Sequence, residues 1–376
     1  MNNKYDVAAF IWPSYTGDEP RTRIFWPEGY GEWQTVKAMT DRGYKGCRWP
    51  RIPTWGYVNE ADSRIMEMQI DCAVSYGVNI FIYDWYWYDN RPFLENCLND
   101  GFLKARNNTD MKFYLMWANH NANHLWDKRN SDNDLSTVIW NGSVTPEIFS
   151  EICDRTIEKY FKRENYYKIN GCPVYMIFDL DNFIRSFSST EECRKAINEF
   201  RQKTVAAGFE GLHFQVVHWH GRSYSWLPDS DINKGADAFG LYRYLGIDSL
   251  TSYNWGCSAK LDGDYNDVTD EYMTNISAYN EDIPFYPNLS VGWDNNVRFN
   301  KFIPGVIYNN TPDNFKKACE RVKTFADESK EKGIMKAPLI TVNSWNEWTE
   351  TSYLQPDDLY GYGYLEAIRK VYCDYE

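Results

Sequence analysis

Several common sequence signals are missing from this chain of 376 residues, and each absence argues against a class of protein. No C-x-x-C pair occurs, and no apolar run reaches the roughly 18 residues that a transmembrane helix needs. The chain has no basic run and its net charge is −13, so we expect no nucleic-acid partner. No G-x-S-x-G or Walker sequence is present, and Gly361-Tyr362-Gly363 follows no strand, which argues against a dinucleotide fingerprint.

The start of the chain has no basic segment followed by an apolar stretch. Strand-like sequence begins at Val7, which leaves no room for a signal peptide. As the sequence stands, we expect a cytoplasmic protein, or a periplasmic or secreted one whose leader has been removed. The nine cysteines are odd in number and several lie in apolar or helical patterns, so we expect reduced structural thiols rather than disulfides.

Aromatic residues are abundant. They make up 17% of the chain, with 16 Trp and 29 Tyr, and hydrophobic residues at 43% are ample for a core. Trp and Tyr in such numbers also suit a cleft that stacks on the faces of carbohydrates. This composition favours a saccharide ligand.

Short apolar runs alternate with helix-like segments along the chain. Eight runs read as strands: residues 7–12, 79–85, 112–118, 173–178, 212–217, 236–242, 285–291 and 339–344. Helical patterns cover residues 60–76, 146–162, 189–207 and 312–332. Most runs are continuously apolar, as in parallel strands covered on both faces. The order predicts one domain, residues 1–376, with an α/β fold: a (β/α)₈ TIM barrel whose long insertion at 13–59 covers part of the mouth.

Catalytic groups of such barrels collect at the C-terminal ends of the strands. These ends carry aromatic rings, carboxylates and amides, which suit a polyhydroxylated ligand better than a phosphate or a planar cofactor. The predicted substrate-binding residues are Tyr15, Asp84, Trp85, Trp87, Trp117, Asn119, His120, His218, His220, Tyr242, Trp293, Asp294, Arg298 and Asn346. For Asp84 and Arg298 a structural role is left open beside the substrate role.

One histidine pair could bind a metal ion. His218 and His220 form an H-x-H pair, whose side chains point the same way on a strand and can chelate zinc. No clear third ligand accompanies them, although Asp179 or Asp294 could lie near. We therefore favour hydrogen bonding to sugar hydroxyls and predict no metal site.

The segment 337–357 carries the most specific pattern. A short buried strand is followed at once by Glu347 and Glu350, which an i,i+3 spacing on a helical turn would place about 5–6 Å apart. Two carboxyls about 5–5.5 Å apart suit retaining glycoside hydrolysis. Trp345 and Trp348 could form flat walls for a sugar and raise one carboxyl's pKa by excluding water. We predict Glu347 and Glu350 as the catalytic residues.

Several motifs together give the chain a family resemblance. They are F-I-W-P-S-Y at 10–15, W-P-E-G-Y-G-E-W-Q-T-V at 26–36, P-R-I-P at 50–53, N-I-F-I-Y-D-W-Y-W-Y at 79–88, L-M-W-A-N-H at 115–120, V-G-W-D-N-N-V-R at 291–298, and N-S-W-N-E-W-T-E-T-S-Y-L-Q-P-D at 343–357 followed by Y-G-Y-G-Y-L-E-A. In this order the chain resembles the WbsX-type, glycoside hydrolase family 99-like proteins.

The resemblance implies a retaining, endo-acting hydrolase of α-mannosides or related glycans that needs no metal, nucleotide or other cofactor. It implies that Glu347 takes the proton of the substrate's own 2-hydroxyl, giving a 1,2-anhydro sugar. Glu350 would protonate the leaving oxygen and then activate water. Tyr242 occupies the position of a family tyrosine near the reacting ring. The oligomeric state is left open.

Two positions differ from the family pattern. Thr351 replaces the usual Gly, and Gln355 replaces a frequent Glu, so we expect changes at the edge of the site that affect the substrate more than the reaction. Proteins of this group are also described as glycosyltransferases of polysaccharide biosynthesis, but no D-x-D with a Rossmann-like half is seen here. A non-catalytic carbohydrate-binding barrel is the other alternative, and the presence of both acids argues against it.

Overall fold

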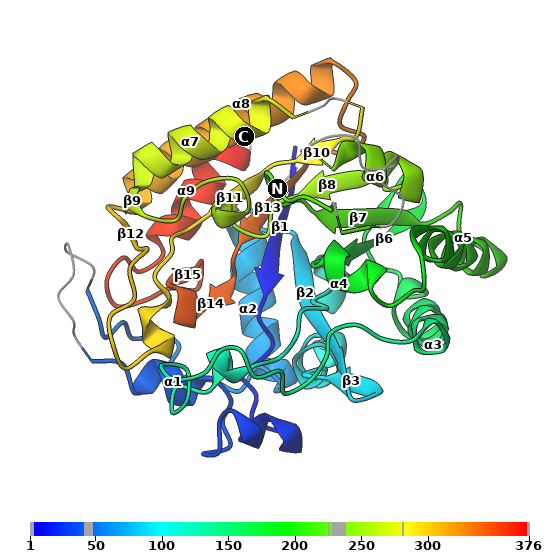
Figure 1. Ribbon diagram of the computed structural model, residues 1–376. Coiled ribbons are helices and arrows are strands. Elements are labelled where there is room, and N and C mark those ends of the chain that lie inside the picture. The colour runs from blue at the N-terminus through cyan, green and yellow to red at the C-terminus, as the bar shows by residue number, and fades with distance from the viewer. Residues whose placement is uncertain (1–3, 41–47, 225, 228–237, 280–281, 374–376) are drawn as a thin grey trace.

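The computed structural model describes residues 4–40, 48–224, 226–227, 238–279 and 282–373. Its centre is a nearly closed barrel of parallel strands surrounded by helices (Figure 1). In barrel order the strands are β10 (Phe285–Tyr286), β8 (Ser249–Thr251), β7 (His213–Val217), β6 (Cys172–Ile177), β4 (Lys112–Trp117), β2 (Ile80–Tyr88), β1 (Asp6–Ile11), β13 (Leu339–Asn343) and β11 (Asn288–Ser290). The predicted β/α barrel is confirmed.

One strand in two pieces closes the barrel. β10 pairs with β8, whereas β11 pairs with β13 on the other side of the gap. Pro287 lies between the two pieces, and its carbonyl accepts a hydrogen bond from the amide of Thr341 at 3.0 Å. Because proline has no N–H, it ends one ladder where the next begins. The predicted strand 285–291 therefore pairs with β8 through its first part and with β13 through its second part.

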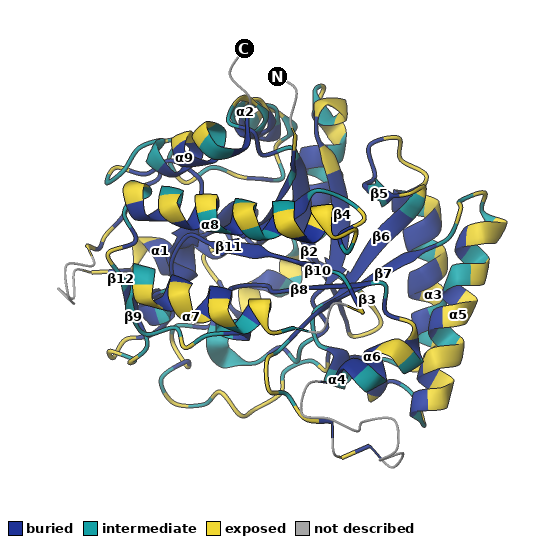
Figure 2. Cartoon of the chain, turned by 90° about the horizontal axis from the view of Figure 1, so that it is seen from above, coloured by how far each residue is buried: buried dark blue, intermediate teal, exposed yellow. Residues whose placement is uncertain are grey.

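Amphipathic helices cover the outside of the barrel, and the short α1 lies at its mouth (Figure 1). The helices are α1 (Trp33–Lys37), α2 (Ser63–Ser75), α3 (Pro146–Thr156), α4 (Leu180–Ile184), α5 (Thr190–Ala206), α6 (Phe239–Leu245), α7 (Tyr265–Ser277), α8 (Pro312–Glu331) and α9 (Gly363–Tyr372). The four predicted helices match α2, α3, α5 and α8. Their caps explain where they begin: Asp62, Thr145, Ser189 and Thr311 each accept a backbone N–H of the first turn. In Figure 2 the exposed residues of α7 and α8 lie on the outer side of each helix.

Shorter elements complete the chain. Short strands outside the barrel path are β3 (Arg91–Phe93), β5 (Lys168–Ile169), β9 (Gly263–Asp264), β12 (Ile307–Tyr308), β14 (Asn346–Glu347) and β15 (Ser352–Tyr353). Single helical turns are η1 (Pro20–Ile24), η2 (Cys97–Gly101), η3 (Phe102–Lys104), η4 (Asn108–Asp110), η5 (His124–Trp126), η6 (Ile157–Phe161), η7 (Trp255–Cys257), η8 (Asn295–Arg298) and η9 (Trp348–Glu350). In Figure 1, α1 of the 13–59 insertion and β3 lie beyond the lower ends of β1 and β2, which are their C-terminal ends.

The sixth predicted strand is wrong. Residues 236–237 lie outside the described part of the chain, and the rest of the run belongs to helix α6, in which Phe239, Leu241, Tyr242 and Leu245 are buried. The sixth barrel strand is instead β8, only three residues long. A short apolar run fits a buried helix as well as a strand, because periodicity alone does not separate them.

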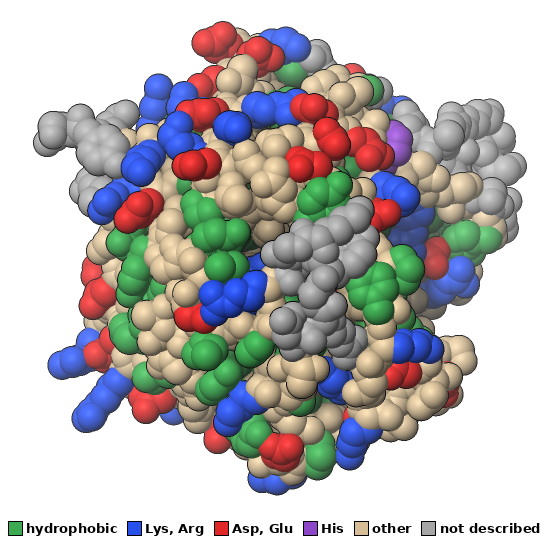
Figure 3. All heavy atoms as spheres, turned by 90° about the vertical axis from the view of Figure 1, so that its left-hand side faces the viewer, with side chains coloured by type: hydrophobic (Ala, Val, Ile, Leu, Met, Phe, Trp, Pro, Cys, Tyr) green, Lys and Arg blue, Asp and Glu red, His purple; other side chains and the backbone are tan. Residues whose placement is uncertain are grey.

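The structure also bears on the cysteines, on membrane-spanning helices and on the surface charge. Eight described cysteines are free, as predicted, and Cys47 lies outside the described residues. No helix in the described chain is long and apolar enough to cross a membrane. On the face shown in Figure 3, acidic and basic side chains are interspersed among the residues drawn in colour.

Candidate active site

The two predicted acids lie in a hairpin directly after β13. β14 pairs antiparallel with β15, with Glu347 opposite Ser352, and the helical turn η9 lies between them. Glu347 precedes this turn and Glu350 ends it, so the predicted turn after the strand is confirmed. The amide of Glu347 donates to Ser344 Oγ at 2.7 Å, and that hydroxyl donates to the Ser352 carbonyl at 2.7 Å. These bonds fix the backbone that carries the acids.

The turn ends on a residue in the left-handed conformation. Thr351 has φ 55°, a region that costs residues with a Cβ about 1–2 kcal/mol and glycine almost nothing. A glycine at this position thus has a backbone reason, and Thr351 offsets part of the strain by donating from Oγ1 to the Asp294 carbonyl at 2.9 Å. Thr351 and Gln355 are both buried. The expectation that they lie at the edge of the substrate site is wrong.

Arg298 connects the two acids. Its Nη1 lies 2.8 Å from Glu350 Oε1, and its Nη2 lies 2.7 Å from Glu347 Oε1. Its Nε lies 3.3 Å from Glu32 Oε1, which comes from the 13–59 insertion. All four side chains are buried. η8 carries Arg298, and Asp294 caps this turn by accepting the amide of Asn296 at 3.0 Å.

A tyrosine joins a third acid to this group. The Tyr253 hydroxyl lies 3.1 Å from Asp84 Oδ2 and 3.2 Å from Glu347 Oε2. Since a phenol has one O–H, it donates to one of these acids at a time. The carboxyl oxygen of the other acid must then carry a proton and donate it to the phenol oxygen, or it has no hydrogen bond to the phenol. Asp84 Oδ1 is buried without a hydrogen-bond partner.

Burial dominates the ionisation of these groups. It raises the pKa of Glu347, helped by the charge of Glu350 and opposed by Arg298. It also raises the pKa of Glu350, again opposed by Arg298, and holds the pKa of Asp84 well above its usual range. In the described chain, Arg298 is the one cation that pairs with these carboxyls. A single positive charge cannot balance them all, so the site holds at least one carboxyl proton at neutral pH.

A pocket of ≈ 240 Å³ opens over these groups. Asp84, His120, Arg298, Glu347 and Glu350 line it, which brings together five of the predicted site residues. Its aromatic walls are Trp12, Tyr86, Trp126, Phe178 and Tyr253. Rings around a few convergent polar groups are typical of a small-molecule site.

Three predicted tryptophans point away from this pocket. Successive side chains of a strand alternate in direction, so Asp84 and Tyr86 face the pocket while Trp85 and Trp87 face outward. Trp85 Nε1 donates to Glu95 at 2.8 Å, and Trp87 lines a separate pocket. Trp117 stacks on Phe149 of α3 with ring centroids 6.1 Å apart. Their prediction as residues that bind substrate in this pocket is wrong.

Four other predicted residues lie in the core beneath the two acids. Tyr15, Trp345, Asn346 and Trp348 are fully buried and do not line the pocket. The Trp348 amide donates to the Tyr15 hydroxyl at 3.2 Å. The interpretation of Trp345 and Trp348 as walls for a sugar is therefore wrong. The two rings belong to the core under the acids.

The remaining predicted residues lie elsewhere around the mouth. His218 Nδ1 is 2.9 Å from the Tyr242 hydroxyl, and His220 stacks on Tyr279, all outside the pocket. Asn119 forms two hydrogen bonds with the backbone of Asp179, at 2.7 and 2.8 Å. Asp294 and the half-buried Trp293 do not line the pocket. Within the described residues no group of three or more His, Cys, Asp or Glu could hold a metal ion.

Sequence reasoning missed Tyr253 and Glu32. Tyr253 lies two residues after β8, so the correct sixth strand places it near a strand end, where Tyr242 is expected. Glu32 lies in the insertion and far from any strand end; its place in the motif at 26–36 is the signal that could single it out. Trp12 directly follows β1, and Tyr86 lies near the end of β2, where strand alternation points it to the same side as Asp84.

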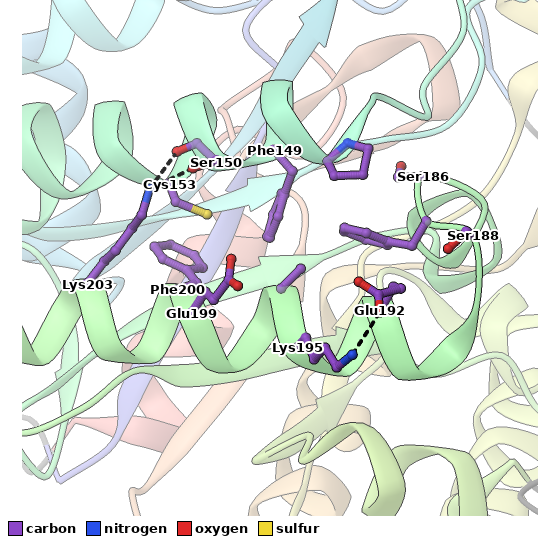
Figure 4. Close-up of a pocket in the computed structure, with 13 residues that line it drawn as sticks. Phe149, Ser150, Cys153, Ser186, Ser188, Glu192, Lys195, Glu199, Phe200 and Lys203 are labelled. Carbon is purple, nitrogen blue, oxygen red and sulfur yellow. Dashed lines mark hydrogen bonds and ion pairs between the residues drawn. The ribbon is translucent and has the colours of Figure 1, made fainter.

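A larger pocket of ≈ 380 Å³ lies outside the barrel between α3 and α5 (Figure 4). Its lining includes Phe149 and Phe200, and its two lysines are bonded within it: Lys195 to Glu192 at 2.8 Å, and Lys203 to Ser150 Oγ at 2.7 Å. None of the predicted site residues lines it. No carboxyl pair converges there, so the smaller pocket is the candidate active site.

Tyr253→Phe is expected to lower kcat/KM roughly ten- to hundredfold for the reaction that these carboxyls catalyse. The variant removes the one hydrogen bond that the phenol donates to Asp84 or Glu347, and hydrogen bonds to charged groups contribute about 1.5–3 kcal/mol. Steady-state kinetics measures the effect. The exposed Tyr57→Phe serves as the matched control with unchanged kinetics, and equal kcat/KM in both variants would exclude Tyr253 from the site.

A parallel β/α barrel with paired carboxyls in an aromatic pocket at the C-terminal ends of its strands is typical of enzymes that act on carbohydrates. The chain belongs to the family described as Glycosyltransferase WbsX, whose model matches residues 7–368. Two curated relatives are uncharacterized WxcX proteins of Xanthomonas campestris pv. campestris, strains B100 and ATCC 33913. Each is 22% identical over 382 residues, covering 97% of this chain and 49% of the relative. The chain thus spans about half the length of the curated relatives it matches.

Solved structures share the fold. A family 99 endo-alpha-mannosidase of Bacteroides thetaiotaomicron matches with a TM-score of 0.58 at 13% identity, over 97% of this chain and 95% of that one. A "glycoside hydrolase-like protein" matches with a TM-score of 0.60 at 13% identity, over 100% and 96% of the two chains. At this identity the likeness concerns the fold.

Proposed function

We propose that this protein is a glycoside hydrolase with Glu347 and Glu350 as its catalytic pair. The observation that carries the proposal is that one guanidinium bridges both carboxyls at the base of an aromatic pocket. Retaining hydrolysis needs two close carboxyls with different protonation states. We propose further that residues 1–376 form one catalytic domain.

The hydrogen bonds of the two acids support different roles for them. Glu347 accepts from Arg298 at 2.7 Å, from Tyr253 at 3.2 Å and from Thr349 Oγ1 at 3.4 Å, and such donors favour the charged carboxylate. Glu350 accepts from Arg298 through Oε1, while its Oε2 is buried and has no partner. These donors oppose burial and the charge of Glu350, which raise the pKa of Glu347 well above its usual range. We therefore propose that the proton of the pair lies on Glu350 Oε2, to which no group donates, with Glu347 as the base and Glu350 as the acid.

In the first step Glu347 accepts the proton of the sugar 2-hydroxyl, and O2 attacks C1 to give a 1,2-anhydro sugar. The bond from C1 to the leaving oxygen breaks, and that oxygen takes the proton of Glu350. In the second step water gives a proton to Glu350 and attacks C1, while O2 recovers its proton from Glu347. Each step inverts C1, so the configuration is retained. The nucleophile is already part of the substrate, which keeps the entropic cost small.

We propose an α-mannoside or a related glycan as the substrate class, supported by the fold and the pocket. The solved neighbour named as an endo-alpha-mannosidase supports an α-mannoside or related complex glycan and endo action. A pocket of ≈ 240 Å³ lies below the ~300–1,000 Å³ usual for whole drug-sized ligands. It suits a single sugar ring at the acids, with the rest of the glycan at the mouth.

A glycosyltransferase is the second candidate, because the matching family model carries that description. Transfer would need space for a nucleotide-sugar beside the acceptor, which favours a larger site than this pocket. The test is product analysis by NMR and mass spectrometry on a panel of α-mannans and other bacterial and plant glycans. Cleavage with retained configuration supports the hydrolase, whereas transfer from an added nucleotide-sugar without cleavage supports the transferase.

A further inference from the structure

A buried carboxyl lies beneath the catalytic hairpin, outside the pocket. Glu60 is fully buried just before α2 and accepts three side-chain amides: Gln355 at 2.8 Å and Gln69 at 3.1 Å on Oε1, and Asn346 at 2.8 Å on Oε2. The Cys97 thiol lies 4.0 Å from Oε2. In the described chain no ion pair joins Glu60 to a cation. Every neighbour that bonds to it is a donor.

The amides that reach Glu60 also hold the residues on both sides of Glu347. Gln69 Oε1 accepts the indole N–H of Trp345 at 2.7 Å, and Gln355 Oε1 accepts that of Trp348 at 2.7 Å. Asn346 is fixed at both ends, since its Oδ1 accepts the Trp12 amide at 2.8 Å and its Nδ2 donates to the Trp12 carbonyl at 2.9 Å. Trp345, Asn346 and Trp348 thus converge on one carboxylate, directly or through a single amide.

This arrangement needs the ionised carboxylate. A protonated Glu60 would carry an O–H and require an acceptor. The three amide oxygens around it are already committed, two to the indoles and one to the Trp12 backbone. Rotating Gln69 or Gln355 to offer its oxygen would release Trp345 or Trp348, and an unmade buried bond costs about 1–3 kcal/mol. A glutamine at position 60 would also place a donor, its NH₂ group, where the neighbouring amides offer only donors.

We propose that Glu60 is a positioning residue for the catalytic hairpin: its buried carboxylate, through three amides, holds the two tryptophans and the asparagine that flank Glu347. This deepens the proposed function and rests on it for the consequence in catalysis. The geometric part stands independently, since it concerns the hairpin alone. Burial raises the pKa of Glu60 to about 7, against the effect of its three amide donors, so its ionisation falls in an accessible pH range. The titratable groups that face it are Cys97, Tyr15 and Tyr83.

The first experiment observes the hairpin without any substrate. In ¹⁵N-tryptophan-labelled full-length protein, the indole resonances of Trp345 and Trp348, assigned with Trp→Phe variants, are followed against pH. We expect both to titrate together near pH 7 in the wild type. In Glu60→Gln we expect both to be displaced and to show no such titration. Resonances unchanged by Glu60→Gln, or a titration that persists in it, would overturn the proposal.

Two further variants separate positioning from loss of stability. Cys97→Ala removes only a weak thiol contact to Glu60 and no bond to the hairpin, so at a pH above the titration its indole resonances and its kcat should match the wild type. Gln69→Met removes the direct acceptor of the Trp345 indole, whereas Trp348 is reached only through Gln355, whose Nε2 also donates to Gln69 Oε1 at 3.1 Å. The variant should therefore displace Trp345 more than Trp348. If Glu60→Gln fails to fold, Gln69→Met decides: displacement of neither indole, or a larger displacement of Trp348, contradicts the proposed network.

Kinetics then tests the consequence. On a cleaved glycan, Glu60→Gln should lower kcat about ten- to hundredfold with little change in KM, because Glu347 is displaced while the pocket stays intact. Displaced indoles with wild-type kcat would overturn the positioning role. If no glycan is cleaved by the wild type, the proposed function fails, and the NMR titration still decides whether Glu60 holds the hairpin.

Discussion

Glu347→Gln is expected to lower kcat roughly 10²- to 10⁴-fold on every glycan that the wild type cleaves, whatever the leaving group. The amide cannot accept the 2-hydroxyl proton, so the internal nucleophile is not activated. Because Gln is close to Glu in shape, KM should change little. Steady-state kinetics with product detection measures the loss.

Glu350→Gln should depend on the leaving group. A leaving oxygen of low pKa needs no proton, so an activated aryl glycoside should still undergo the first step, whereas a natural glycan should lose roughly 10²- to 10⁴-fold. The exposed Glu366→Gln is the matched control and should behave as the wild type. Equal dependence on the leaving group in both acid variants would contradict the assigned roles, and unchanged cleavage in both would refute the site.

Arg298→Met should destabilise the protein by roughly 3–5 kcal/mol and abolish activity. The change leaves Glu32, Glu347 and Glu350 buried without their shared cation. Urea unfolding measures the stability. The exposed Arg106→Met, which breaks a surface ion pair with Glu67, is the control and should unfold as the wild type does.

The pH dependence of this variant has a definite sign. Without Arg298 the folded-state pKa values of these carboxyls rise further, so the folded state binds protons that the unfolded state has released. The stability of the variant should then fall as pH rises from about 5 to about 8, and its difference from the wild type should grow. A difference that is constant over this range would show that Arg298 acts through packing rather than charge.

Much of the fold could be predicted from the sequence because parallel strands leave long apolar runs. β1, β2, β4, β6, β7 and β13 were found this way, and the caps marked the long helices. The sixth strand could not be found, since β8 is short and partly polar, with Ser249 and Thr251 around one leucine. The stronger apolar signal at α6 comes from a helix whose buried face packs against the barrel.

The candidate site could be predicted in its acids but not in its surroundings. Glu347 and Glu350 can be predicted because two acids and two tryptophans alternate directly after a buried strand, whereas for Asp84 and Arg298 the sequence leaves a structural role equally open. The tryptophans cannot be placed by residue type, because Trp suits either a sugar face or a core; strand alternation puts Trp85 and Trp87 on the face opposite Asp84. Glu32 could not be found because its role depends on a contact with Arg298, 266 positions away.

The catalytic hairpin bonds to residues near the N-terminal end of the chain, so it can form only late in folding. Asn346 bonds to Trp12 across 334 positions, Trp348 to Tyr15 across 333, and Trp345 to Gln69 across 276. Contacts this distant in sequence form slowly, because the chain between them must be ordered first. During synthesis, the bonds from Asn346 and Gln355 to Glu60 cannot form until the last part of the chain has been made. The active site should therefore be among the last regions to become protected against hydrogen exchange during refolding, well after the strands between β2 and β7.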